Sequence, residues 1–281
     1  MLIFRNIKRI QKFIIGLKKK GKTIGFVPTM GYLHEGHLSL MRQSKRENDI
    51  SVISIFVNPI QFGPKEDFGK YPRDFKRDEK LAKLTGVDII FYPSIEQMYP
   101  TGYLSYVEVE KLSNFLCGVS RPGHFRGVTT VVAKLFNIVQ PDIAYFGQKD
   151  AQQVRIIQKM TKDLNMPIKV KVMSIVRESD GLAMSSRNMY LSSQERKDAL
   201  ILNRALKEAR RLIKTGVRDS RTIISTLNYL ISTNKTAKIE YIKIVDPQTL
   251  TEVKKIEKSV LIVLAVWIGK TRLIDNLAVN L

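Results

Sequence analysis

Two of the three histidines in this 281-residue chain, His34 and His37, lie within four residues of each other. They follow an apolar, strand-like segment that ends at Val27, and a helical pattern begins near Gly36. The N–H groups and the positive dipole end at a helix start favour phosphate. Two imidazoles on one side of the first turn can donate to phosphate oxygens. The pattern therefore predicts a site for nucleotide phosphate.

Two other interpretations of the histidine pair stay open from the residues alone. The pair can be two surface or hydrogen-bonded histidines without a ligand. It can also be part of a zinc site, but a third ligand at a suitable spacing is not evident, and the motif differs from His-Glu-x-x-His.

A second candidate phosphate loop is Met-Ser-Ser-Arg at residues 184–187. Two hydroxyls and a guanidinium can hold a triphosphate on the face opposite the histidines. Alone, this motif is also typical of a solvated turn. Together with His-x-Gly-His it resembles the adenylate-forming superfamily of class I aminoacyl-tRNA synthetases and small nucleotidyltransferases, whose second loop is of the Lys-Met-Ser-Lys-Ser type.

The elements that must position these motifs alternate between strand and helix. Such alternation with largely apolar strands predicts a Rossmann-like, doubly wound parallel sheet. In such sheets, ligands bind beyond the carboxyl ends of the strands. We expect an N-terminal helix over about 3–17, strands at 24–27, 50–57, 89–92, 144–146 and 168–176, and helices at 37–47, 74–85, 127–140 and 150–163.

The pattern changes after Ser186. Helices are expected at about 193–214 and 219–233, with strands near 239–245, 260–266 and 271–276. This order is typical of a smaller α+β domain. We expect a nucleotide-binding first domain over residues 1–176 and a C-terminal lid domain over residues 177–281.

Composition excludes several classes of protein. The content of 44% hydrophobic residues excludes a disordered basic tail. The single cysteine excludes an internal disulfide, and no apolar run reaches the ~20 residues of a membrane span. The net charge of +21 suggests nucleic acid, but residues 51–150 carry only +1. A basic, solvated surface is therefore the favoured interpretation.

At family level, the sequence closely resembles the pantoate–β-alanine ligases. Six motifs carry the resemblance in order along the chain: Pro28–His37, Phe56–Phe62, Tyr71–Asp74, Arg121–Val128, Phe146–Gln153 and Arg177–Asn188. Many family members have Glu where this chain has Gln148. The family's N-terminus begins at about the same place, so no presequence is expected.

The resemblance implies an AMP-forming ligase that works in two steps. The carboxylate of pantoate attacks the α-phosphate of ATP, giving pantoyl adenylate and pyrophosphate. The amine of β-alanine then attacks the acyl carbon and releases AMP. Such chemistry needs positioning and charge stabilisation rather than a covalent nucleophile.

The resemblance also implies site residues. It makes His37, His34 and Lys149 catalytic, and it places pantoate on Asn58, Gln61 and Gln153, with Arg126 as a further substrate contact. Its ATP-binding residues are Met30, Gly31, Tyr32, Leu33, His34, Glu35, Gly36, His37, Gly147, Gln148, Lys149, Asp150, Val176, Met184, Ser185, Ser186 and Arg187. His124 is expected to be structural.

The implied partners are ATP, pantoate and β-alanine, with Mg²⁺ bound to the phosphates. Asp74 is a weak candidate for the metal, and a helix cap is the favoured role for it. A homodimer in the cytoplasm is expected, without nucleic acid or membrane. The rival hypotheses are a class I aminoacyl-tRNA synthetase-like enzyme acting on tRNA and a basic nucleic-acid-binding domain with inert motifs. Against the rivals stand the short chain and the intact histidines, Lys149 and Ser185–Arg187.

Overall fold

The computed structural model describes residues 1–64 and 66–281, and the chain divides into two compact units. The first comprises Met1–Gly147 and Gln153–Ser174, and the second comprises Gln148–Gln152 and Ile175–Leu281. A short segment after the fifth strand thus groups with the second unit although the residues on both sides of it belong to the first.

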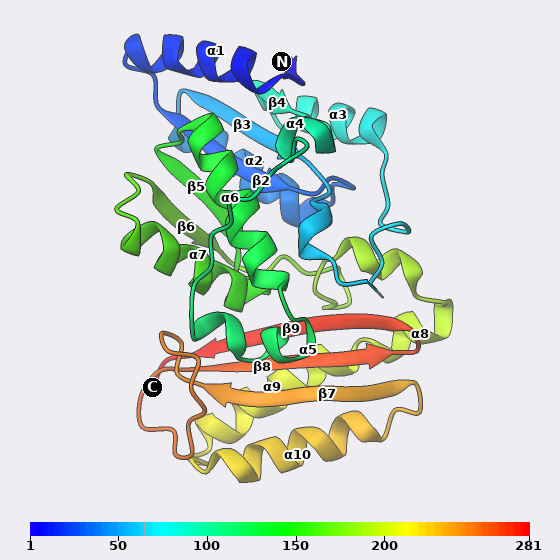
Figure 1. Cartoon of the computed structure of the whole chain (residues 1–281). Coiled ribbons are helices and arrows are strands. Elements are labelled where there is room, and N and C mark those ends of the chain that lie inside the picture. The colour runs from blue at the N-terminus through cyan, green and yellow to red at the C-terminus, as the bar shows by residue number, and fades with distance from the viewer. Residues whose placement is uncertain (65) are drawn as a thin grey trace. The chain divides into compact units, whose positions relative to one another are not determined.

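A six-stranded parallel sheet forms the centre of the first unit (Figure 1). Its strand order is β1-β4-β3-β2-β5-β6, so the chain winds outward in both directions from β2. The strands are β1 (Leu2–Phe4), β2 (Ile24–Thr29), β3 (Ile50–Ile55), β4 (Ile89–Phe91), β5 (Ile143–Gly147) and β6 (Lys169–Met173).

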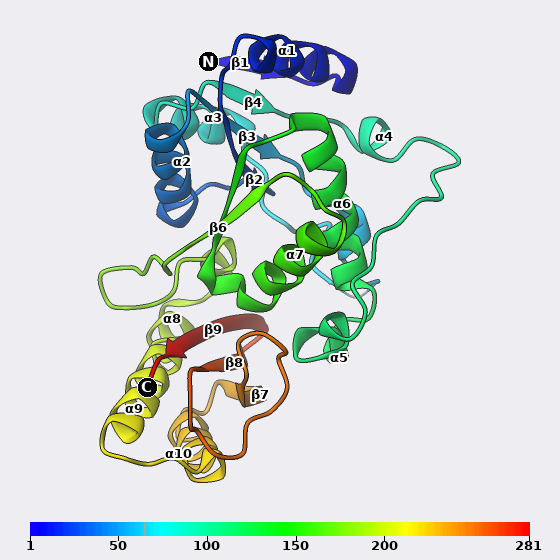
Figure 2. The same cartoon turned by 90° about the vertical axis from the view of Figure 1, so that its left-hand side faces the viewer.

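Helices cover both faces of this sheet. Crossover connections between parallel strands are right-handed, so those that run in opposite directions from β2 place their helices on opposite faces. Figure 2 shows α2 and α3 on one side and α6 and α7 on the other. The helices are α1 (Ile7–Lys19), α2 (Glu35–Glu47), α3 (Phe75–Leu84), α4 (Ile95–Met98), α5 (Cys117–Ser120), α6 (His124–Val139) and α7 (Ala151–Asp163), with 3₁₀ turns η1 (Pro59–Gln61) and η2 (Leu112–Asn114).

The two central strands are buried almost throughout. Val27 of β2 and Ile53 of β3 have no exposed surface, and they pack with Leu33 and Met41 in one core. Because this core lies directly under the carboxyl ends of β2 and β3, it fixes the positions at which the loops after these strands begin.

The N-terminal prediction was partly wrong. The helix expected from residue 3 begins at Ile7, and Leu2–Phe4 instead form β1, which pairs in parallel with β4. A three-residue apolar run fits either a strand or a first helical turn, so periodicity does not separate them. Asn6 decides the boundary, because its side chain accepts the Arg9 N–H at 3.1 Å as a helix cap.

The second unit is an antiparallel three-stranded sheet packed on helices (Figure 1). Its elements are η3 (Gln148–Asp150), η4 (Ser186–Tyr190), α8 (Ser193–Asp198), α9 (Ile201–Lys214), α10 (Ser220–Ser232), β7 (Ala237–Val245), β8 (Val260–Ile268) and β9 (Thr271–Val279). Leu206 of α9, Leu227 of α10 and Ile262 of β8 are buried in its core. The predicted Rossmann-like sheet with a smaller α+β part is confirmed.

The single helix expected over 193–214 is wrong, because the structure has α8 and α9 with a break at Ala199–Leu200. Two contacts at Asp198 account for the break. Its carbonyl accepts from Asn234 Nδ2 at 3.1 Å, and its carboxylate accepts from the Thr236 hydroxyl at 2.6 Å. These partners are distant in sequence, so local periodicity gives no sign of them.

No helix within residues 1–64 and 66–281 combines the length and the apolar character that crossing a membrane requires.

Candidate active site

The histidine motif begins where β2 ends. Gly31 has φ +82°, and a Cβ there would lie 2.9 Å from both Asp78 Oδ2 and the Ile55 side chain. Glycine is therefore required at this position for its backbone conformation and for its lack of a side chain. Tyr32 also has positive φ, and the chain then enters α2 with His34 at the N-cap.

The two imidazoles lie against each other at the start of α2. Their ring centroids are 4.0 Å apart, and the His34 N–H donates to His37 Nδ1 at 3.4 Å. Because Nδ1 of His37 accepts, the proton of the neutral ring is on Nε2. The first turn of α2 thus presents backbone N–H groups and imidazoles at the positive end of the helix dipole.

Asp78 of α3 holds the loop between β2 and α2. Its carboxylate accepts the N–H of Tyr32 and that of Leu33, each at 2.7 Å, and the residue is 1% exposed. Burial raises the pKa of the Asp78 carboxyl, against the opposing effect of the two N–H bonds. Leu33 has no exposed surface, and its N–H is bonded to Asp78, so it supports the loop from within the core.

We expect Asp78→Asn to lower kcat/KM for ATP by about tenfold and the free energy of unfolding by ~1–3 kcal/mol. An amide has one oxygen, so its NH₂ group would oppose one of the two loop N–H groups. Steady-state kinetics and thermal unfolding measure the two effects. Glu79→Gln on the same helix is the control, and an equal loss of activity in both variants would contradict the role of Asp78.

A buried amide pair follows β3. Asn58 Nδ2 donates to Gln61 Oε1 and to the Gly127 carbonyl, each at 3.0 Å, and Asn58 Oδ1 accepts from the Tyr99 hydroxyl at 2.7 Å. Burial raises the pKa of Tyr99, so its phenol stays a donor. Both N–H groups of the Asn58 amide are therefore engaged, and Asn58 orients Gln61.

Gln61 connects this pair to the histidine loop, because its Nε2 lies 3.1 Å from Met30 Sδ. Its backbone carbonyl contacts His124 Nδ1 at 2.8 Å. His124 thus contacts the backbone of the η1 turn. The close approach of α6 to η1 depends on Gly127, where a Cβ would lie 2.3 Å from the Ile60 carbonyl oxygen.

The remaining predicted residues of the first unit lie near helix starts. Arg126 is in the first turn of α6, with its guanidinium 3.9 Å from the centroid of the Tyr106 ring. Gln153 is half-buried at the start of α7. Asp74 caps α3, because its Oδ1 accepts the Arg77 N–H at 3.0 Å. The prediction that Asp74 is a helix cap is confirmed.

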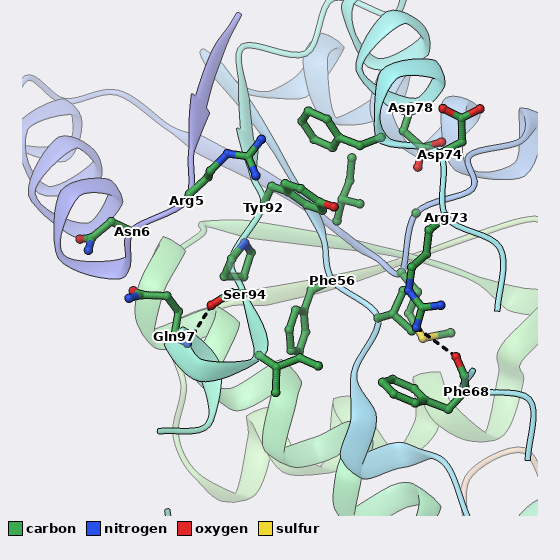
Figure 3. Close-up of a pocket in the computed structure, with 17 residues that line it drawn as sticks. Arg5, Asn6, Phe56, Phe68, Arg73, Asp74, Asp78, Tyr92, Ser94 and Gln97 are labelled. Atoms are coloured by element: carbon green, nitrogen blue, oxygen red, sulfur yellow. Dashed lines mark hydrogen bonds between the residues drawn. The ribbon is translucent and has the colours of Figure 1, made fainter. Parts of the chain in front are cut away.

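A cavity of about 480 Å³ lies beside Met30 and Gly31 (Figure 3). Asp78 lines it, and Arg73, shown in Figure 3 with its bond to the Phe68 carbonyl, is on the same side. Its lining residues come from the ends of β3 and β4, from α3 and α4, and from Arg5 and Asn6. Met30 and Gly31 line it, whereas the two histidines and the pair Asn58 and Gln61 do not, so the cavity lies beside the predicted site at the carboxyl ends of the strands.

The second unit contains the other predicted cations. Lys149 Nζ lies 3.4 Å from Asp150 Oδ1, and its side chain is 22% exposed. The loop that carries it, Gln148–Asp150, is a 3₁₀ turn bonded to Asn276 of β9 through both Gln148 and Lys149.

Met184–Arg187 follow a short hairpin in the same unit. Residues Arg177 and Ala183 pair in antiparallel fashion, and Met184 N donates to the Val176 carbonyl at 3.0 Å. Ser185 Oγ then accepts the Arg187 N–H at 3.3 Å at the start of η4.

The predicted residues are thus divided between the two units. The first contains the segment Met30–His37 and the pair Asn58 and Gln61. The second contains Gln148–Asp150, Val176 and Met184–Arg187. Sequence reasoning missed Asp78, Tyr99 and Asn276, which contact these residues from distant positions. Asn276 stands in a largely apolar strand segment, which is a weak local sign, whereas Asp78 stands in a polar helix segment and gives none.

A parallel sheet with a histidine-bearing helix start after β2 is typical of a nucleotide-binding α/β protein. The family model for pantoate–β-alanine ligase matches residues 2–278. The chain belongs to the pantoate–β-alanine ligase family, and it is a ligase.

Individual relatives match this chain over almost its whole length. The pantothenate synthetase of Sulfurihydrogenibium sp. (strain YO3AOP1) is 59% identical over 278 residues, covering 99% of both chains. A crystal structure of pantothenate synthetase from Thermus thermophilus has a TM-score of 0.94 at 42% identity, with 99% of each chain covered.

A third relative is known with ligands. The Francisella tularensis enzyme, complexed with beta-gamma ATP and beta-alanine, has a TM-score of 0.79 at 37% identity, covering 99% of this chain and 97% of the other.

Proposed function

We propose that this chain joins (R)-pantoate to β-alanine at the expense of ATP, through pantoyl adenylate. A pantoate carboxylate oxygen forms a bond to the α-phosphorus of ATP, and pyrophosphate leaves. The β-alanine nitrogen then bonds to the acyl carbon and loses a proton, and AMP leaves. The observation that carries the proposal is the contact between Gln61 and Met30, because it joins a phosphate-type loop to a polar site for a hydroxy acid.

In the first unit, we assign the triphosphate to His34, His37 and the backbone of the Met30–His37 segment. The proton on His37 Nε2 suits donation to a phosphate oxygen as charge moves to pyrophosphate. Gln61 and Gln153 contact pantoate, with Arg126 as a further substrate contact. Asn58 orients Gln61, and the oxygen of its side-chain amide is the atom that would contact pantoate.

In the second unit, Lys149 neutralises phosphate charge, and Asp150 accepts from the ribose. Gly147, the last residue of β5 and part of the first unit, and Gln148 lead to them along the chain. Val176 and the loop of Met184, Ser185, Ser186 and Arg187 complete the adenine and phosphate contacts. A guanidinium suits phosphate because its planar fork donates two parallel hydrogen bonds.

Magnesium is proposed to enter with ATP, bound by the phosphates. Among residues 1–64 and 66–281, no group of three or more His, Cys, Asp or Glu side chains is arranged to hold a metal. Asp74 is engaged as a helix cap. The ion would screen the phosphates from the incoming carboxylate.

We further propose that the enzyme is a cytoplasmic homodimer that acts on small molecules rather than on nucleic acid or membranes. Support for the small-molecule substrates comes from the family match and from the low net charge of residues 51–150. The match over residues 2–278 favours this function over an enzyme acting on tRNA.

The test is a reconstitution with purified protein. We expect AMP, pyrophosphate and pantothenate in equal amounts when ATP, Mg²⁺, pantoate and β-alanine are all present, and loss of turnover when EDTA removes Mg²⁺. Without β-alanine, the enzyme should still exchange labelled pyrophosphate into ATP in the presence of pantoate. Turnover that needs tRNA and an amino acid instead would overturn the proposal.

A further inference from the structure

The last strand, β9, contains a buried polar pair, Asp275 and Asn276, each 3% exposed. Successive side chains of a strand point to opposite faces of the sheet. Leu273 and Leu277, which share the face of Asp275, pack on the core of the second unit. The Asp275 side chain therefore lies on the core side of the sheet, and the Asn276 side chain lies on the opposite side.

Asn276 contacts the loop that carries Lys149. Its Nδ2 donates to the Gln148 carbonyl and to the Lys149 carbonyl, each at 2.9 Å, and its Oδ1 accepts from Gln148 Nε2 at 3.2 Å. Two of these bonds fix the backbone of two consecutive residues, and the third holds the Gln148 side chain. The position of the Lys149 side chain depends on this backbone.

Asp275 contacts the base of the other phosphate loop. Its two carboxylate oxygens accept from the Arg177 guanidinium at 2.7 and 2.9 Å, and Arg177 Nη1 also donates to the Gly181 carbonyl at 3.1 Å. Arg177 opens the hairpin that ends at Ala183, directly before Met184–Arg187. The bidentate ion pair thus fixes the hairpin from which this loop leaves.

Stability alone does not explain the pair. Burying an ion pair gives little net stability compared with well-packed apolar residues, and the neighbours on the Asp275 face are leucines. A buried polar group is instead able to specify one arrangement of the elements it connects. Here the two connected elements are the two predicted phosphate loops of the second unit.

We propose that Asp275 and Asn276 are positioning residues that set the Lys149 loop and the Met184–Arg187 loop in register with each other before ATP binds. Because two neighbouring residues of one strand bond to the two loops, the backbone of β9 sets the distance between Lys149 and Arg187. The inference rests on the roles proposed above for Lys149 and Arg187. Neither residue of the pair needs to touch the substrate.

The test compares Asn276→Asp with the original enzyme in the pantoate-dependent exchange of pyrophosphate into ATP. The new carboxylate has the same shape but faces two carbonyl oxygens and cannot donate. In this exchange we expect kcat/KM for ATP to fall by about 10- to 30-fold, while KM for β-alanine, measured in the complete reaction, changes by less than about twofold. Asp275→Asn, which loses the charge that faces Arg177, should act in the same direction.

A double-mutant cycle shows whether Asn276 acts through Lys149. In a Lys149→Ala background, Asn276→Asp should lower the rate by less than about threefold. An equal fold-loss in both backgrounds would overturn the proposal, and so would an unchanged kcat/KM for ATP in Asn276→Asp.

Glu240→Gln is the matched control. Glu240 of β7 pairs with Arg272 of β9 at 2.8 Å on the same sheet. Its loss removes none of the bonds described for Asp275 and Asn276, so it should not raise KM for ATP. A rise in this control as large as that in Asn276→Asp would mean that general loosening of the sheet causes the effect, and would refute the assignment. Thermal unfolding checks that each variant folds, and Asn276→Ser, which keeps one donor, is used if Asn276→Asp does not.

The failure of this inference is distinguishable from the failure of the proposed function. If the unchanged enzyme makes no pantothenate from the three substrates, the function fails. If the unchanged enzyme makes pantothenate and the variants have the same kcat/KM for ATP, only the positioning role of Asp275 and Asn276 fails.

Discussion

Replacing His37 by alanine is expected to lower the rate of pantoyl adenylate formation by about 10²- to 10³-fold, the usual effect of removing one preorganised donor from a transition state. His37 stands at the first turn of α2, and its Nδ1 accepts the His34 N–H. Nε2 therefore carries the proton, and in the proposed site it faces the oxygens that become more negative as pyrophosphate leaves. Pantoate-dependent pyrophosphate exchange measures this step directly.

His37→Gln tests whether donation or proton transfer matters. A glutamine amide donates a hydrogen bond but does not transfer a proton, so recovery of a large part of the rate would indicate a stabilising donor. Arg46→Ala, an exposed position on the same helix, is the control and should keep the original rate. A His37→Ala enzyme as active as that control would remove His37 from the mechanism.

Lys149→Met is expected to lower kcat/KM for ATP by about 10²-fold, or ~2.7 kcal/mol of transition-state stabilisation. Methionine keeps the length and the apolar stem of the side chain but removes the charge. Lys149 is 22% exposed, and Asp150 is the carboxylate beside it, so the ammonium group is accessible to a phosphate that replaces or joins this partner. ATP titrations at saturating pantoate and β-alanine measure the effect.

The control for Lys149 is another lysine in the following helix. Lys159 of α7 pairs with Asp163 at the surface, and exposed pairs of this kind contribute at most ~1 kcal/mol. Lys159→Met should therefore leave the kinetics of ATP unchanged. Equal kinetics in the two variants would show that overall positive charge, rather than the position of Lys149, assists ATP binding.

Local patterns were sufficient for most of the fold. Strands buried on both faces are largely apolar, as in Ile50–Ile55, and the helices between them repeat with the helical period. The order of these elements implies a parallel sheet with ligands at its carboxyl end. The patterns failed for β1 and for the break between α8 and α9, where contacts with β4, Asn234 and Thr236 decide the structure.

The sequence by itself determined the chemistry of the site. The residues proposed to bind phosphate stand in short motifs at loop positions, because the ends of strands and the starts of helices are defined by nearby residues. They are His34, His37, Lys149 and Arg187. A close resemblance to one family of ligases followed from six such motifs in order.

Only the tertiary structure decided what holds these motifs in place. Asp78 accepts two N–H groups of a loop 45 residues before it in the chain, Tyr99 orients Asn58, and Asp275 and Asn276 hold both loops of the second unit. Each is a single polar residue without a local motif. Its role depends on a hydrogen-bond partner brought near by folding, and long-range packing rather than local spacing sets that distance.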